Sequence, residues 1–169
     1  QLSEREGADE ATQYWARQIR EGLPRVQPVT GAGGAALGGQ GFGGRIDGAL
    51  RDAVRRQARA LGTTTAVVLF TAFLRLLRRF YESDQVAAYL IYAGRERAEF
   101  KDTVGVFVSP LAVVSRLGAT APPAQSVRSV HGEVQELLKH QSFPMELALD
   151  RLGAPPFAPP FAFNMLDLP

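Results

Sequence analysis

The sequence contains two histidines, His131 and His140, and histidine is the side chain best suited to acid-base chemistry near neutral pH. His131 lies in a segment with helical spacing, and Glu133 falls on a different face of that helix because it is two residues on. His140 lies near the predicted end of the same helix, where its side chain suits the helix dipole. Neither histidine has the spacing of a metal-binding pair, and the chain has no cysteine. We therefore expect structural roles for both histidines and no metal site.

A glycine-rich stretch, GQGFGG from Gly39 to Gly44, matches the G-x-G-x-x-G pattern of dinucleotide-binding loops. That pattern cradles a pyrophosphate only between a buried strand and a helix N-terminus. Here an irregular, proline-containing stretch precedes it, and no helix opens at its last glycine. We therefore interpret residues 31–44 as a flexible surface loop. The sequence has no G-x-S-x-G motif that would accompany a nucleophilic serine.

The segment KDTVGVFVSPLAVVSRL, residues 101–117, is apolar and β-branched but is interrupted by Ser109 and Pro110. Proline has no N–H group for a sheet ladder and is confined to edge strands and bulges. The segment is therefore either an edge strand that its proline protects from aggregation, or a strand whose interruption borders a functional site. Both interpretations stay open at this point.

Apolar periodicity and turn residues predict an alternation of helices and strands. Gly22 follows the first helix, Gly62 is a natural C′ residue after the second, and Pro144 starts the last. The threonines before Ala66 can cap the third helix. Helices are expected over residues 10–19, 47–61, 64–81, 123–140 and 144–152, and strands over 85–94, 104–117 and 157–169. This alternation indicates an α/β fold, in which helices pack on a sheet.

Composition places limits on the partners and the location of the chain. At 169 residues and 46% hydrophobic content, it is expected to form a single domain over residues 1–169. The net charge is only +2 and comes from scattered arginines, which argues against nucleic acid as the main partner. The N-terminus is polar, and the longest apolar run, residues 66–74, is about half the roughly 20 residues that span a bilayer. We therefore expect no membrane anchor and, because cysteine is absent, a reducing cytoplasmic location.

Four segments follow one another along the chain: QYWARQIREGLP, then the long stretch that ends in AGRERAEF, then DTVGVFVSPLAVVSRL, then KHQSFPMELALDRLG. In this order they resemble the C-terminal half of the condensation domains of nonribosomal peptide synthetases, and the resemblance covers nearly the whole chain. Three motifs of the family carry it: Ala-Gly-Arg, Gly-x-Phe-Val-Asn with a later arginine, and His-Gln-x-x-Pro-Phe-Glu. The matching residues are Arg95, Gly105, Phe107, Val108, Arg116, His140, Gln141, Pro144 and Glu146.

The sequence also departs from the family. Ser109 stands where asparagine is usual, and Met145 replaces the phenylalanine. The family's Arg-Asp-x-Ser-Arg-Asn-Pro-Leu segment is reduced to GAPPFAPPF near Pro155. The His-His-x-x-x-Asp-Gly motif, whose second histidine lies beside the attacking amine in the family, does not occur in this sequence. The resemblance therefore implies one lobe of a two-lobe domain, without catalytic residues of its own and inactive alone.

The resemblance implies a two-layer lobe of the chloramphenicol acetyltransferase type, with a mixed sheet and helices packed on it. In the family this lobe borders a tunnel through which carrier-bound phosphopantetheine arms approach, so no cofactor is expected to bind permanently. The residues expected to line that channel are Val106, Val108, Ser109 and Asn164. Because serine is shorter than asparagine and lacks the amide, any contact made by Ser109 with substrate is weakened.

Two functions of different classes follow. In the first, the chain is part of a condensation domain that joins an acyl or peptidyl thioester to an aminoacyl amine. In the second, it is a degenerate relative that serves as a docking or scaffold module. The expected partners are the N-terminal lobe, adjacent synthetase domains and carrier proteins. An isolated lobe should also expose apolar strand surface around Val106, which predicts a symmetric homodimer.

Overall fold

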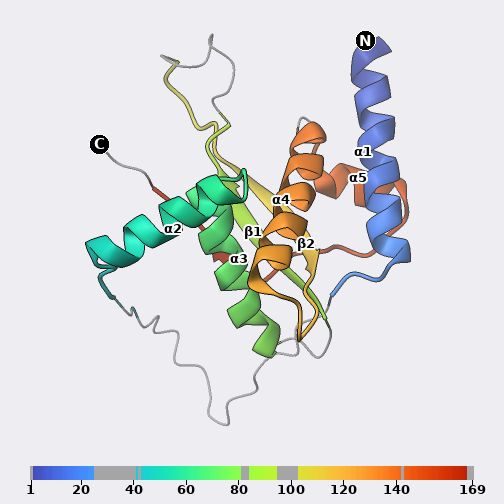
Figure 1. Cartoon of the computed structure of the whole chain (residues 1–169). Helices are drawn as coiled ribbons and strands as arrows, with labels where there is room; N and C mark the ends of the chain where they lie inside the picture. Colours follow the sequence, from blue (N-terminus) through green and yellow to red (C-terminus); the bar gives the residue numbers. More distant parts are fainter. Residues whose placement is uncertain are drawn as a thin grey trace.

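The chain folds into a small sheet with helices around it, as the computed structural model shows (Figure 1). The structure describes residues 2–24, 41, 43–80, 84–94, 103–141 and 143–166. The helices are α1 (Leu2–Arg20), α2 (Gly48–Ala60), α3 (Thr65–Leu77), α4 (Pro123–Lys139) and α5 (Met145–Arg151), with a 3₁₀ turn η1 (Arg78–Phe80) after α3. The strands are β1 (Gln85–Tyr92), β2 (Ser109–Arg116) and β3 (Ala162–Phe163).

The sheet has the strand order β2-β1-β3 and is mixed. β1 and β2 are antiparallel, with a register that runs from Gln85 opposite Arg116 to Tyr92 opposite Ser109. β3 runs parallel to the other edge of β1, where the Tyr89 N–H donates a hydrogen bond of 2.8 Å to the carbonyl oxygen of Phe161. The predicted α/β class with a mixed sheet is therefore confirmed.

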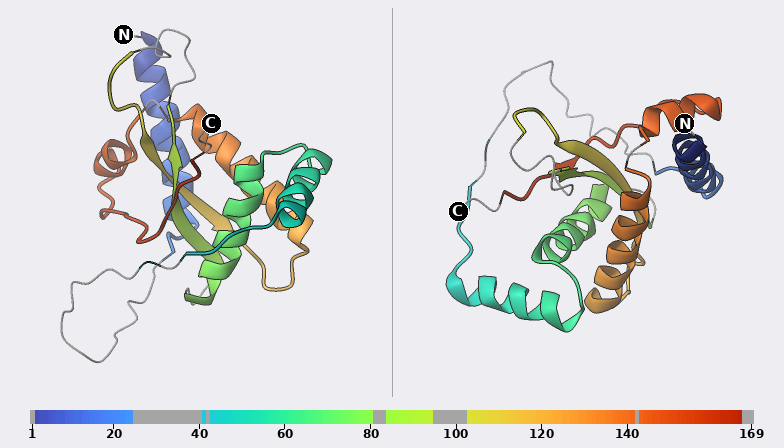
Figure 2. Two further views of the ribbon diagram at one scale, coloured as in Figure 1. Left: turned by 90° about the vertical axis from the view of Figure 1, so that its left-hand side faces the viewer. Right: turned by 90° about the horizontal axis from the view of Figure 1, so that it is seen from above.

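The helices form a second layer on one face of the sheet. α3 and α4 lie side by side there, α3 against β1 and α4 against β2 (Figure 2). α1 packs on α5 at one side of the molecule, and α2 lies at the other side, where it packs on α3 (Figure 1). This arrangement leaves β2 at an edge of the described sheet, next to the side that α1 and α5 occupy.

Local capping explains where the helices begin and end. The Asp47 side chain accepts a hydrogen bond from the Leu50 N–H at the start of α2, and the Thr64 side chain accepts one from the Val67 N–H at the start of α3. Gly62 follows α2 with a φ of +64°, a left-handed conformation that glycine adopts at no steric cost. The predicted limits of α2, and the predicted starts of α3 and α4, are confirmed to within a residue or two.

The core lies between the sheet and its helical layer. Trp15 of α1, Phe70 and Leu74 of α3, Val113 of β2 and Val130 of α4 are all fully buried in one hydrophobic cluster. Burying an aliphatic or aromatic side chain of this size stabilises a fold by about 1.5–3 kcal/mol. The helical spacing that the sequence shows on α3 and α4 therefore produces the packing that holds the two layers together.

The strands are shorter than the sequence predicts. Residues 104–108 precede β2 rather than belong to it, so Ser109 and Pro110 are the first residues of the strand and do not interrupt it. The predicted strand over residues 157–169 is reduced to two residues, Ala162 and Phe163. Most of the glycine-rich segment 31–44, including Gly39, lies outside the described residues, so its interpretation as a loop stays a prediction.

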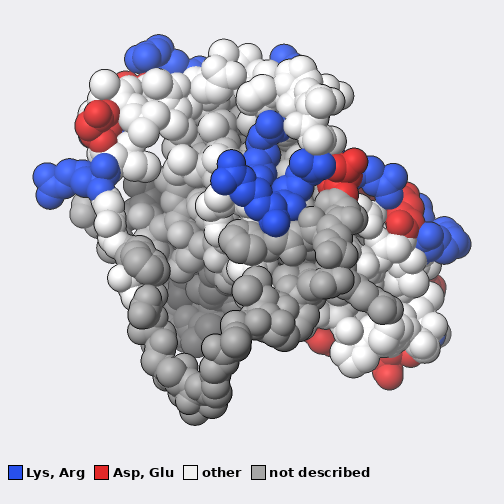
Figure 3. All heavy atoms as spheres, turned by 90° about the horizontal axis from the view of Figure 1, so that it is seen from below, with Lys and Arg blue, Asp and Glu red and all other residues white. Residues whose placement is uncertain are grey.

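Membrane span and surface charge can be compared with the sequence predictions for the described residues. Within them, no helix alone is long and apolar enough to cross a membrane, and only α2 and α3 together satisfy length and composition, with a bend of 104° between them. Seen from below, one group of basic side chains lies near the middle of the face and others lie at its margins, and acidic side chains adjoin some of them (Figure 3).

Candidate functional site

Ser109 and Pro110 lie at the start of an edge strand. Ser109 is half-buried opposite Tyr92, and Pro110 is exposed opposite Ile91. An edge and a first position are where a strand tolerates proline, because no neighbouring strand needs its missing N–H. In the described part of the chain these two residues therefore begin an edge strand and do not interrupt its ladder, and the interpretation that they border a functional site stays a prediction.

The same two residues nevertheless border a small cavity of about 180 Å³. One wall is the start of β2, from Ser109 to Ala112, and the opposite wall is the turn between α4 and α5. The lining residues from that turn and from the start of α5 are His140, Gln141, Phe143, Pro144, Met145 and Glu146. The structure thus brings the His-Gln-x-x-Pro segment against Ser109, which holds the last position of the Gly-x-Phe-Val-Asn motif, although the sequence separates the two by about thirty residues.

Trp15 of α1 closes the cavity, and nothing in the sequence predicts this role for it. Its ring lies edge-on to the Tyr14 ring, with the two centroids 5.2 Å apart. Tyr14 in turn packs against the imidazole of His140, with 5.1 Å between ring centroids. α1 therefore supplies a wall of the cavity through Trp15 and supports His140 through Tyr14.

His140 caps α4 and positions the turn that follows. The backbone N–H of His140 donates a hydrogen bond of 3.0 Å to the carbonyl oxygen of Leu137. Its backbone carbonyl oxygen accepts a hydrogen bond of 3.1 Å from the Phe143 N–H. The side chain is only 9% exposed, and Nε2 lies 3.7 Å from Oε1 of Glu136. The imidazole packs on Tyr14, and among the described residues its buried Nε2 has no hydrogen bond, so the structural role of His140 stays a prediction.

Buried polar atoms gather where α4 faces β2 and α1. The Ser115 hydroxyl adjoins the Glu133 carboxyl, yet within the described residues neither that hydroxyl oxygen nor Glu133 Oε2 has a hydrogen bond with good geometry. Oε1 of Glu133 accepts from the Ser129 hydroxyl at 3.1 Å. Burial raises the pKa of Glu133, and burial together with the carboxylates of Glu133 and Glu136 raises the pKa of Tyr14 to about 12.

His131 points away from this cluster. Its Nδ1 lies 2.9 Å from the Thr63 hydroxyl oxygen, so it ties α4 to the turn between α2 and α3. The prediction that His131 and Glu133 occupy different faces of the helix is confirmed. In the part of the chain that the structure describes, no group of three or more potential metal ligands occurs.

Gly94 and Phe107 bring two more motif segments together. Gly94 has a φ of +64°, and a Cβ atom built on it would overlap the carbonyl oxygen of Phe107. The chain before β2 therefore packs directly on the chain after β1, and only glycine fits at that contact. Arg95 lies outside the described residues, whereas Arg116 is exposed at the far end of β2, opposite Gln85, away from the cavity.

The other residues predicted to line a channel do not surround this cavity. Val104, Val106 and Val108 are 100%, 93% and 54% exposed and alternate along the chain before β2. Asn164 is exposed just after β3, on the opposite side of β1 from Ser109. The three valines and Asn164 are all exposed on or near the sheet, but they do not lie together in one site.

The family model for the condensation domain matches residues 1–166 of the chain. The chain belongs to the condensation domain family. Among curated relatives, surfactin synthase subunit 1 of Bacillus subtilis strain 168 is 25% identical over 155 residues, which are 89% of this chain and 4% of that protein. Tyrocidine synthase 2 of Brevibacillus parabrevis is 30% identical over 110 residues, or 65% of this chain and 3% of that protein. The chain therefore spans a few per cent of the length of these relatives.

Solved structures of condensation domains have the same fold. The first condensation domain of the CDA synthetase aligns with a TM-score of 0.71 at 21% identity, over 94% of this chain and 35% of that one. A four-domain nonribosomal peptide synthetase bound to AMP and glycine aligns with a TM-score of 0.79 at 16% identity, over 95% of this chain and 13% of that one. These likenesses confirm the α/β lobe of the chloramphenicol acetyltransferase type and fit one lobe of a two-lobe domain.

Proposed function

We propose that residues 1–169 form the C-terminal lobe of a condensation domain that makes an amide bond. In that reaction the amine of a carrier-bound aminoacyl group attacks an upstream acyl or peptidyl thioester. The C–N bond forms, the C–S bond breaks and the thiol of the upstream arm is released. The base that receives the amine proton belongs to the N-terminal lobe, because this chain contains no His-His-x-x-x-Asp-Gly motif.

The role of this lobe is to position substrates rather than to move protons. The exposed valines Val106 and Val108 form an apolar wall of the channel between the lobes, and Asn164 contributes a polar group at the end of β3. Ser109 lies where that wall meets the cavity and donates its hydroxyl hydrogen to a substrate carbonyl. Phosphopantetheine arms enter this channel on carrier proteins, which, with the N-terminal lobe and the adjacent synthetase domains, are the partners of the chain.

The observation that carries this proposal is the convergence of Ser109 and the His-Gln-x-x-Pro segment on one cavity, in a chain that matches the family over residues 1–166. Convergence matters because a degenerate module has no need to keep Ser109, His140 and Glu146 around a common space. The shared cavity of these three residues supports the proposal.

A second candidate is a docking module that binds carrier proteins or neighbouring domains without catalysis. It is favoured by Ser109 and Met145, which replace the usual asparagine and phenylalanine, and by the reduced segment around Pro155. Each of these changes weakens a family motif without disturbing the fold. The two candidates differ in whether the parent polypeptide makes an amide.

The test uses a polypeptide that contains this chain together with an N-terminal condensation-domain lobe. It is incubated with acyl-loaded and aminoacyl-loaded carrier proteins, and the amide is followed by mass spectrometry. We expect turnover, a loss of rate in Ser109→Ala, and an unchanged rate in Thr120→Ala, because Thr120 is an exposed turn residue between β2 and α4. Absence of turnover with intact carrier binding would favour the docking module.

A further inference from the structure

The cavity beside Ser109 has an exposed mouth and a buried base. We call it the Ser109 cavity. The lining residues at its mouth are exposed or half-buried: Ser109, Pro110, Gln141, Pro144 and Glu146. The described lining residues that are almost fully buried are apolar: Trp15, Leu111, Ala112 and Leu137. A group that enters from the mouth therefore passes polar side chains first and reaches an apolar surface at depth.

The volume of the Ser109 cavity limits its occupant to one compact group. Another protein's engineered apolar cavity of about 150 Å³ holds a benzene molecule. The Ser109 cavity, at about 180 Å³, is thus large enough for a branched aliphatic or phenyl group and too small for an extended chain. Because the base is apolar, the hydrophobic effect favours the burial of such a group there.

The depth of the cavity is set by α1. Trp15 is only 2% exposed, and its ring lies edge-on to the ring of Tyr14. Ala11, one turn earlier on the same helix, is fully buried. α1 packs along α5, where Oδ1 of Asp9 lies 3.6 Å from Nη1 of Arg151. The indole is therefore held in place by its helix and by Tyr14, so a longer ligand does not displace it.

Two residues that depart from the family motifs both lie in the wall of this cavity. Ser109 stands where asparagine is usual, and Met145 stands where phenylalanine is usual. Serine is smaller than asparagine, and methionine is unbranched and adapts to irregular spaces. One residue belongs to β2 and the other to α5, so the two changes widen the same space from different walls. This coincidence indicates a cavity shaped for an occupant.

We propose that the Ser109 cavity receives the side chain of a substrate amino acid and selects a compact apolar one, such as that of leucine or phenylalanine. The side chain lies between Met145 and Trp15, which determine the specificity, and the substrate carbonyl lies at the Ser109 hydroxyl. The identification of the occupant as a substrate rests on the function proposed above, whereas its size and polarity do not. The amino acid has two sources, the upstream peptidyl group and the downstream aminoacyl group.

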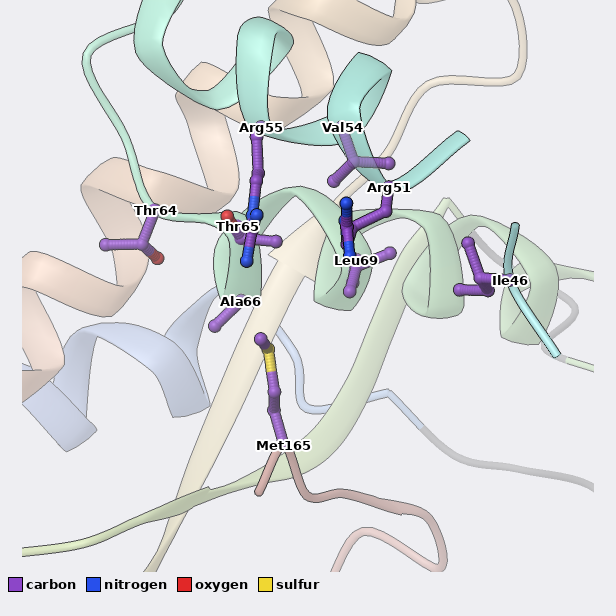
Figure 4. A pocket seen from close by; sticks show the side chains of 9 residues that line it. All are labelled: Ile46, Arg51, Val54, Arg55, Thr64, Thr65, Ala66, Leu69 and Met165. Carbon is purple, nitrogen blue, oxygen red and sulfur yellow. The ribbon is translucent and has the colours of Figure 1, made fainter. Parts of the chain in front are cut away.

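A second pocket, on the other side of the molecule, provides a control. It lies between α2, the first turn of α3 and Met165, and its volume is about 610 Å³ (Figure 4). Arg51 and Arg55 extend from α2 toward α3 at this pocket. Because it is much wider and is bordered by two guanidinium groups, it does not impose the same limit on an apolar side chain.

Binding to the Ser109 cavity is measured on the 169-residue chain by the fluorescence of Trp15, the one tryptophan of the sequence. The probes are the N-acetyl amides of leucine, phenylalanine, alanine and arginine, which differ only in the side chain. We expect the leucine and phenylalanine probes to bind at least about tenfold more tightly than the alanine probe, because each buried methylene group raises the affinity about fourfold. The arginine probe should bind weakly, because the apolar base does not replace the hydration of its charge.

Met145→Phe narrows the cavity and should lower the affinity for the phenylalanine probe at least about tenfold while it leaves the alanine probe unchanged. Ser109→Asn narrows the other wall and should weaken the phenylalanine probe as well. Leu147→Phe is the matched control, because Leu147 is 51% exposed on α5 and is not among the described lining residues. Met165→Gln is the control for the α2 pocket, and both controls should bind as the native chain does.

Three results would overturn the assignment of the cavity. The first is equal affinity for the leucine and alanine probes. The second is an equal loss of affinity in Met145→Phe and Leu147→Phe. The third is a loss of affinity in Met165→Gln, which would place the probes in the α2 pocket.

The amide-forming assay shows which substrate supplies the side chain. Leucine and alanine are compared on the downstream carrier with a fixed upstream group, and then on the upstream carrier with a fixed downstream group. Met145→Phe should lower the ratio of the leucine rate to the alanine rate in at least one series, and that series identifies the source. An unchanged ratio in both series would overturn the assignment to a substrate. Absence of amide with every variant would instead refute the proposed function, while the probe titration still decides the cavity.

Discussion

Among Gly→Ala substitutions at the described glycines, Gly94→Ala should destabilise the chain the most. Gly94 has a φ of +64°, and its added Cβ would overlap the carbonyl oxygen of Phe107. A left-handed conformation costs a non-glycine residue about 1–2 kcal/mol. Forcing an extra methyl group into a packed contact adds about 1–3 kcal/mol. The expected loss in the free energy of unfolding is therefore about 2–5 kcal/mol.

Gly62→Ala is the matched control for this prediction. Gly62 has the same φ of +64° but no atom within 4 Å of an added Cβ, so it should lose only the conformational part, about 1–2 kcal/mol. Urea unfolding followed by the fluorescence of Trp15, the one tryptophan of the sequence, measures both variants. Equal losses in Gly94→Ala and Gly62→Ala would show that the chain after β1 does not pack on the chain before β2, and the site geometry would have to be revised.

Three further changes probe the core, the buried carboxyl and the exposed valines. Phe70→Ala should lower the free energy of unfolding by about 3–5 kcal/mol because Phe70 is fully buried. Phe73→Ala should lower it less because Phe73 is only half-buried. Similar urea midpoints for the two variants would contradict the packing of α3. Burial raises the pKa of Glu133 above the ordinary 4.5, so the folded state keeps a proton that the unfolded state releases. The free energy of unfolding therefore falls as the pH rises from about 4.5 through the raised pKa of Glu133. Glu133→Gln should remove that fall in urea melts across pH 4–8, and a parallel pH dependence in both proteins would refute a buried carboxyl. Val106 is exposed, so the isolated chain should associate into a dimer that Val106→Lys disrupts; light scattering that shows a monomer at all concentrations would mean the valines are already covered.

The two ends of α2 and the start of α3 could be predicted from the sequence because local residues fix them, whereas α1 begins at Leu2 rather than near residue 10. Asp47 and Thr64 cap α2 and α3, and Gly62 ends α2, through contacts with residues that are near in the sequence. The strands could not be bounded in this way. β2 begins at Ser109 because β1 ends at Tyr92 in the antiparallel register, and β3 is short because only Ala162 and Phe163 pair with β1. Such limits depend on partners distant in the sequence.

The candidate site was predictable in its motifs but not in its walls. His140, Pro144 and Ser109 stand out because their segments resemble a family, and the structure places them around one cavity. Trp15 gave no such signal, because an aromatic residue at helical spacing predicts only a buried face. The burial of Glu133 could not be predicted either, because a glutamate on an amphipathic helix is normally exposed to solvent. Glu133 is shielded from solvent only when α4 packs against β2 and α1.

The central claim is that this chain is one of two lobes that make an amide only together. The most direct measurement compares amide formation by the chain alone, by an N-terminal condensation-domain lobe, and by both mixed, with the same loaded carrier proteins. The account predicts product only in the mixture, and less of it when the chain carries Val106→Lys. Product from the chain alone, lost on substitution of His131 or His140, would contradict the account and place the chemistry within this lobe.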